Sequence, residues 1–77
     1  MRPSFVVDTR GLFCPIPVIK TSNALENLDP GSIVEVISDD PGIEFDLPAW
    51  CASHGHTIRR VEKESGVYRY WVEKQKG

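Results

Sequence analysis

Residues 8–18 have the sequence DTRGLFCPIPV and join the first predicted strand of the chain to its first predicted helix. The strand, Phe5 to Asp8, is aromatic and β-branched, and a loop with one glycine follows it. Pro15 and Pro17 suit a helix start, because the N–H groups that prolines lack have no intrahelical partner in a first turn. This stretch therefore predicts a strand, a loop and a helix, with Cys14 at the N-cap of the helix.

Apolar periodicity predicts the other elements. The first helix continues to residue 28, and Asp29-Pro30-Gly31 ends it. Its buried stripe is predicted at Val18, Ile19, Ser22, Ala24, Leu25 and Leu28. A β-branched run predicts a strand at 32–38. The last predicted elements are a helix at about 46–54, capped by Asp46 with Pro48 in its first turn, and an antiparallel strand pair at 57–64 and 67–73.

The element order β-α-β-α-β-β predicts an α/β (α+β) two-layer sandwich. Right-handed crossovers place both helices on one face of a four-stranded sheet. The strands at 32–38 and 67–73 carry apolar residues on both faces, so the pattern does not decide which face is buried. An apolar open face would be a docking surface for a partner, although scattered exposed apolar residues are also common.

Length and composition are those of one small globular domain. The chain has 77 residues, 40 % of them hydrophobic and 26 % charged. We expect a single domain, 1–77, in which residues 73–77 fray. Two cysteines exclude a disulfide-dense scaffold. No apolar run approaches the roughly 18 residues of a membrane helix, and Asp8 comes too early for a signal-peptide core. We therefore expect a cytoplasmic protein with no membrane contact and a monomeric state.

Charge is unevenly distributed along the chain. The net charge is −2, with three basic and eight acidic residues in 1–58 against six basic and three acidic residues in 59–77. A weakly acidic chain is a poor match for the many phosphate contacts of tight nucleic-acid binding, so we expect no direct nucleic-acid partner. We favour a solvated mixed-charge hairpin as the explanation for the basic residues of 59–77, and contact with an acidic protein surface is the alternative.

Cys14 is the residue with the clearest chemical potential. The partial positive charge of a helix N-terminus favours a thiolate and lowers a cysteine pKa. With prolines at 15 and 17, the Ile16 N–H is the remaining donor that an N-cap side chain would normally use. Arg10 would add a second positive charge if it folds back. The alternative is that Cys14 is a small buried residue that happens to precede a helix.

The motif around this cysteine resembles the signature of the TusA/SirA-like family of small sulfur-carrier proteins. The matching pattern is D-x-R-G-L-x-C-P-x-P-V over residues 8–18. Later segments are similar to the TusA branch rather than to more distant members: DDP at 39–41, DLPAWC at 46–51, GH at 55–56 and YRY at 68–70. The resemblance extends from about residue 7 to residue 74.

This resemblance implies a two-layer fold with a mixed sheet and a role in sulfur transfer. Cys14 would accept sulfane sulfur from a cysteine desulfurase, hold it as a persulfide and pass it to a downstream relay protein. Asp8, Arg10, Gly11, Pro15 and Pro17 match the supporting positions of the motif. No resident cofactor is implied beyond the transient persulfide, and the protein would act with partners rather than as a stand-alone enzyme.

The resemblance implies a destination for the sulfur, and several alternatives remain open. The implied end point is 2-thiouridine in tRNA, and sulfur oxidation or molybdenum-cofactor formation are alternative pathways. A protein of another class would be a regulatory module that binds partners through the open sheet face. A dithiol pair of Cys14 and Cys51 is a further hypothesis, although we expect Cys51 to be a packing residue.

Three other residue clusters are weaker candidates. Cys51, His54 and His56 offer zinc-type ligands without a fourth nearby, so we predict no metal site. A dyad of Cys14 with a histidine would need an orienting group and an oxyanion site. Asp39 and Asp40 precede Pro-Gly and are typical of a solvated turn that could influence partner docking.

Overall fold

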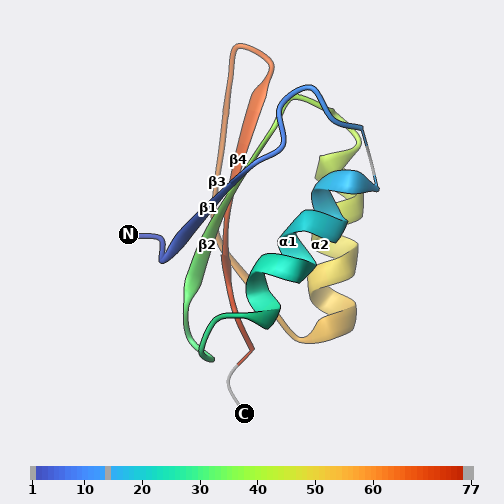
Figure 1. The fold of residues 1–77 in the computed structure, drawn as a ribbon. Coiled ribbons are helices and arrows are strands. Elements are labelled where there is room, and N and C mark those ends of the chain that lie inside the picture. The colour runs from blue at the N-terminus through green and yellow to red at the C-terminus, as the bar shows by residue number, and fades with distance from the viewer. Residues whose placement is uncertain (1, 14, 76–77) are drawn as a thin grey trace.

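The computed structural model describes residues 2–13 and 15–75 of the chain and shows two helices packed on one sheet (Figure 1). The elements are β1 (Phe5–Asp8), α1 (Ile16–Glu26), β2 (Ile33–Ser38), α2 (Ile43–His54), β3 (Thr57–Glu64) and β4 (Val67–Glu73). The sheet order is β1-β2-β4-β3, with β1 parallel to β2 and the other neighbours antiparallel. This mixed two-layer fold confirms the predicted class.

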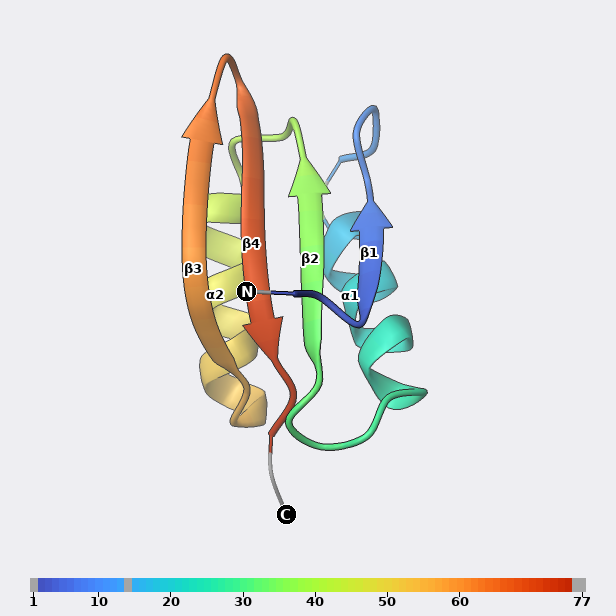
Figure 2. The same ribbon diagram turned by 90° about the vertical axis from the view of Figure 1, so that its left-hand side faces the viewer.

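Both helices cover the same face of the sheet, α1 behind β1 and β2 and α2 behind β3 and β4 (Figure 2). The core lies between these two layers, because Val34, Val36 and Val72 are fully buried against the helices. Leu25 from α1 and Leu47 from α2 complete it. Within the part of the chain that the structure describes, no helix is long and apolar enough to cross a membrane.

The structure decides which face of each strand is buried. The β2 and β4 residues in the core cluster face the helices, whereas Ile37 and Trp71 lie on the open side with only 7 % and 9 % exposure. Long charged side chains cover these two residues. Arg60 lies over the Trp71 ring, 5.6 Å from its centroid, and Arg69 pairs with Glu35 at 2.8 Å. The open face is therefore a charged layer and not an apolar docking surface.

The start of α2 differs from the prediction. The helix begins at Ile43 with Gly42 as its N-cap, so the predicted start at Asp46 is wrong by one turn. The Asp40 carboxylate accepts the Gly42 N–H at 3.1 Å, which turns the chain directly into the helix. Pro48 therefore lies inside the helix rather than in its first turn.

The N-terminal half of α1 also differs from its predicted pattern. Pro15, and not Cys14, is the N-cap. Pro17 and Thr21 occupy the buried stripe together with Leu25, while the predicted core residue Ile19 is exposed. Thr21 is polar but compatible with burial, because its hydroxyl donates to the Pro17 carbonyl at 2.8 Å.

The end of β4 is hydrogen-bonded to neighbouring segments. Glu73 belongs to the strand, and the Lys74 N–H donates to the Ser32 carbonyl at 2.8 Å. The Gln75 N–H donates to His56 Nδ1 at 2.9 Å. Residues 73–75 thus bond to neighbouring segments, and the expectation that residues 73–77 fray stays a prediction; residues 76–77 lie outside the described residues.

Replacement of Leu47 by Ala should lower the free energy of unfolding by about 2–5 kcal/mol, because it leaves a cavity at a fully buried site. Urea unfolding followed by circular dichroism measures the change. The control Phe45→Ala removes an exposed side chain from the same helix and should change stability by no more than about 0.5 kcal/mol. Equal losses in the two variants would contradict the layer arrangement.

Candidate functional site

The end of β1 and the loop that follows it hold three of the residues predicted to support the site. Asp8 and Arg10 form a two-pronged ion pair, with Nη2 to Oδ2 at 2.6 Å and Nε to Oδ1 at 3.0 Å. The Arg10 backbone N–H also donates to Asp8 at 3.1 Å. These hydrogen bonds lower the pKa of Asp8 to about 2. Arg10 is thereby held at the end of β1, and its guanidinium is committed to Asp8 rather than folded back as an independent charge.

Gly11, the third supporting residue in this loop, contacts a residue that we did not predict as part of the site. Its N–H donates to both carboxylate oxygens of Asp39, at 3.0 and 3.1 Å. Its φ of +85° lies in the left-handed region, where a side chain would strain the backbone. Asp39 thus joins the loop before α1 to the loop before α2. Twenty-eight residues separate the pair, so no local motif could reveal it.

Thr9 anchors the same loop from inside the fold. It is fully buried, and both its hydroxyl and its N–H donate to the Ile37 carbonyl, at 2.6 and 2.7 Å. The polar residue Thr9 was absent from the predicted core, because a threonine after a strand is an ordinary loop residue. These bonds fix the start of the loop, five residues before the motif cysteine, to the end of β2.

Cys14 itself lies outside the described residues, but the residues on both sides are placed. The Ile16 N–H donates to the Phe13 carbonyl at 2.9 Å, so the donor that we assigned to the Cys14 sulfur is already engaged. Pro17 is buried and fixes the first turn. The first turn of α1 contains no acidic side chain that would offset the positive end of the helix dipole.

Cys51 is 2 % exposed within the core, which confirms its predicted packing role. Burial raises the pKa of its thiol to about 11. At neutral pH the thiol is almost entirely protonated, and protonated thiols are poor nucleophiles. Cys51 is therefore a poor redox partner. The hypothesis that it pairs with Cys14 stays untested, because Cys14 lies outside the described residues.

The two histidines near Cys51 take part in a ring cluster. Trp50 stacks on His54 with ring centroids 4.6 Å apart, and His56 lies 5.1 Å from Trp50. Burial and the nearby charges of His54 and Lys74 lower the pKa of His56. Across residues 2–13 and 15–75, no three potential metal ligands come together.

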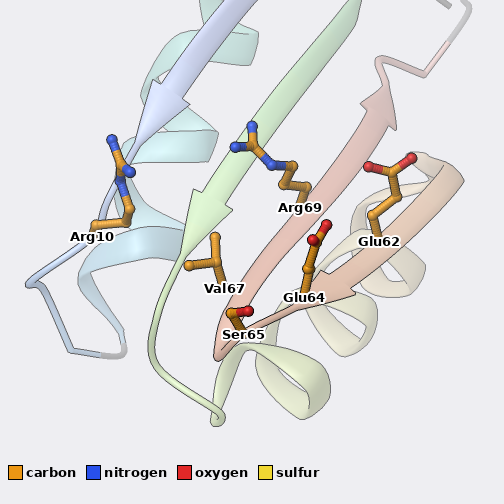
Figure 3. A pocket seen from close by; sticks show the side chains of 6 residues that line it. All are labelled: Arg10, Glu62, Glu64, Ser65, Val67 and Arg69. Carbon is orange, nitrogen blue, oxygen red and sulfur yellow. The ribbon is translucent and has the colours of Figure 1, made fainter.

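A groove of about 200 Å³ lies on the open face beside Arg10 (Figure 3). Arg10 lies at one side, Arg69 lies on β4 in the middle, and Glu62 and Glu64 lie on the β3 side. Arg69 is paired with Glu35 at 2.8 Å. The groove is shallow and polar, so it offers a charged contact surface rather than an enclosed substrate pocket.

The family model described as Sulfurtransferase TusA matches residues 5–74. The chain belongs to the TusA family. It is 36 % identical over 74 residues to the putative sulfur carrier protein YrkI of Bacillus subtilis. The aligned region covers 96 % of this chain and 99 % of that protein. It is 37 % identical to the sulfur carrier protein TusA of Pseudomonas aeruginosa, with 91 % and 89 % coverage.

A solved structure supports the family assignment independently. The crystal structure of the SirA-like protein from Desulfitobacterium hafniense aligns with a TM-score of 0.80 and 29 % identity, covering 94 % of this chain and 99 % of that one. Family and fold thus agree with the resemblance found in the motif.

Asp39→Ala should free the loop that carries Gly11, because the Gly11 N–H loses both of its acceptors. We expect faster amide exchange at Gly11 and a loss of about 0.5–1.5 kcal/mol in unfolding free energy. Amide exchange followed by NMR measures the first effect. Asp39→Asn keeps one acceptor oxygen and should exchange more slowly than the Ala variant, whereas identical exchange in both would contradict the contact.

Cys14 should react with iodoacetamide before Cys51 in the native protein at pH 7.5. The physical reason is that Cys51 is buried and its pKa is raised to about 11. Timed labelling with peptide mass spectrometry measures the two rates. Labelling in urea serves as the control and should bring the rates close together, and equal rates in the native protein would refute the expected difference.

Proposed function

We propose that this TusA-family chain is a cytoplasmic sulfur carrier that holds sulfane sulfur as a persulfide on Cys14. The observation that carries the proposal is the family match over residues 5–74, together with the motif D-x-R-G-L-x-C-P-x-P-V between the end of β1 and the start of α1. The relatives named as sulfur carriers span nearly the same length as this chain. A sulfur carrier presents one thiol to successive partners, which requires no enclosed pocket.

The environments of the two cysteines support the assignment to Cys14. Cys51 has a raised pKa and is buried in the core, so it is unsuited to thiol–persulfide exchange with another protein. Cys14 precedes a helix whose N-cap is Pro15 and whose second residue is Pro17. A helix start without first-turn acids favours a nearby anion, which assists both formation of the thiolate and its later departure.

The proposed reaction is thiol–persulfide exchange. The Cys14 thiolate attacks the terminal sulfur of a persulfide on the donor, and a new S–S bond forms. The S–S bond of the donor breaks, and its cysteine leaves as a thiolate with the electron pair. The total oxidation level is unchanged, so the step needs no external oxidant, reductant or resident cofactor. Delivery repeats the same exchange with an acceptor thiolate.

The donor in this proposal is a cysteine desulfurase, and the acceptor is a downstream relay protein. We propose 2-thiouridine formation in tRNA as the end point, on the resemblance to the TusA branch, with sulfur oxidation and molybdenum-cofactor formation as alternatives. The chain carries a net charge of −2, so binding of the tRNA itself would belong to a later protein.

The decisive experiment loads the protein with sulfur. The wild-type chain, incubated with a cysteine desulfurase, pyridoxal phosphate and cysteine, should gain the mass of one sulfur atom on Cys14, as measured by intact-protein and peptide mass spectrometry. Cys14→Ser should gain none, because no thiolate remains at that position.

The matched control is Cys51→Ser, which keeps the motif cysteine and should load like the wild type. Unmodified wild-type protein, or equal loading of Cys14→Ser, would overturn the carrier function. Full cellular activity of Cys14→Ser would instead support the regulatory-module hypothesis. Failure of Cys51→Ser alone, with its fold intact by circular dichroism, would point to the dithiol hypothesis.

A further inference from the structure

The short segment Gly55-His56 joins α2 to β3, and the function proposed for Cys14 does not use it. The segment lies at the end of the sheet opposite the loop between β1 and α1. Figure 2 shows the ends of α1, α2 and β4 together at this end. The two residues that follow β4, Lys74 and Gln75, bond here to neighbouring connections, and we name them the C-terminal strap.

The C-terminal strap is bound to two different connections of the fold. The Lys74 N–H donates to the Ser32 carbonyl at 2.8 Å, and the Gly31 N–H donates to the Lys74 carbonyl at 3.1 Å. Lys74 Nζ also donates to the Leu28 carbonyl. These bonds attach Lys74 to the connection between α1 and β2, whereas Gln75 contacts the connection between α2 and β3.

Both residues of the Gly55-His56 segment contact Gln75. The Gln75 N–H donates to His56 Nδ1 at 2.9 Å. The Gln75 side chain lies over Gly55, where a Cβ atom would come within 2.8 Å of it. Gly55 ends α2 with a φ of +76°, so its backbone conformation and this close approach both favour glycine.

The bond from Gln75 requires one protonation state of His56. An N–H donor needs a ring nitrogen with a free lone pair, so Nδ1 carries no proton and the neutral ring has its proton on Nε2. Protonation of Nδ1 would place two hydrogens between two nitrogen atoms that are 2.9 Å apart. The bond therefore forms with the neutral ring and is lost when the ring is charged.

His54 makes a contact of the opposite kind. Its Nδ1 lies 2.9 Å from the Trp50 carbonyl oxygen, and because a carbonyl oxygen accepts, the ring nitrogen donates. A charged ring and a neutral ring with its proton on Nδ1 can both make that bond. Protonation therefore breaks the contact of His56 and preserves that of His54.

The surroundings of His56 favour the neutral ring. Burial lowers its pKa, and the nearby charges of His54 on α2 and Lys74 in the strap lower it further. Glu26 of α1 lines the same shallow pocket and would favour the charged ring, but the combined effect is still a lowered pKa. An ordinary histidine titrates near pH 6.5, so His56 is neutral at pH 7.5 and becomes charged in mildly acidic solution.

We propose that His56 is a pH-sensitive latch for the C-terminal strap: the neutral ring holds Gln75, and the charged ring releases it. The backbone bonds of Lys74 to Gly31 and Ser32 involve no titratable group, so release begins at Gln75 and leaves Lys74 attached. The latch lies at the opposite end of the sheet from the loop that leads to Cys14 and does not depend on the carrier function.

Two substitutions separate the Gln75 N–H from the Gln75 side chain. Gln75→Pro removes the N–H, whereas the matched control Gln75→Ala keeps it. Titration of the His56 ring nitrogens in the full chain is followed by ¹⁵N NMR. We expect Gln75→Pro to raise the titration midpoint by about 0.5–1 pH unit, because the neutral ring loses its donor, and Gln75→Ala to stay within about 0.2 pH unit of the wild type. Equal midpoints in the two variants would overturn the latch.

A variant with an acceptor that does not titrate tests the consequence for stability. In His56→Asn, a side-chain oxygen can accept the Gln75 N–H at every pH. In the wild type, the unfolded chain binds a proton on His56 more readily than the folded chain does, so stability falls as the pH falls from about 6.5 through the folded-state pKa. Between pH 7.5 and pH 5, urea unfolding should show a loss in the folding equilibrium constant about three- to tenfold larger in the wild type than in His56→Asn.

Three results would contradict the latch. The first is the same pH dependence of stability in the wild type and in His56→Asn, because the loss would then come from other groups. The second is a Gln75 amide signal that stays constant while His56 titrates, since we expect both to move with one midpoint. The third is a wild-type His56 ring with its proton on Nδ1 at pH 7.5. None of these measurements involves Cys14, so the latch and the carrier function are tested separately.

Discussion

The parallel pairing of β1 with β2 is the constraint on which the site depends. It brings the C-terminal ends of both strands, and therefore the starts of α1 and α2, to the same end of the sheet. Two contacts hold the connection between β1 and α1 at this end. Thr9 bonds to the Ile37 carbonyl from inside the fold, and the Gly11 N–H bonds to Asp39 on the surface. The residues on either side of Cys14 are positioned by this arrangement and not by a pocket.

The sequence contained enough information to predict the element order and the motif, because both depend on local patterns. β-branched runs, prolines and glycines predicted five of the six elements to within a residue or two. The start of α2 could not be located in this way, since Pro41-Gly42 is compatible with a free turn as well as with a turn that enters a helix. The Asp40 carboxylate decides between these, through its bond to the Gly42 N–H.

Long-range features were beyond the reach of local patterns. Asp39 looked like a solvated turn residue, and only its approach to Gly11 shows that it holds the motif loop. The buried face of β2 was also ambiguous, because Ile37 is as apolar as Val36. The structure resolves the ambiguity through arginine and glutamate side chains, whose long stems cover apolar residues while their charges remain in water.

β3 has a consequence for the behaviour of the protein in a crowded solution. It is an eight-residue edge strand with the sequence TIRRVEKE, and its pairing with β4 is interrupted by a bulge between Ile58 and Arg60. A long edge strand offers unpaired backbone groups to any other strand that approaches, which is a common route to aggregation. Five of its eight residues are charged, and charges and bulges both oppose such pairing. The protein can therefore remain dispersed at high concentration although the apolar side chains of Phe13 and Phe45 are exposed elsewhere on its surface.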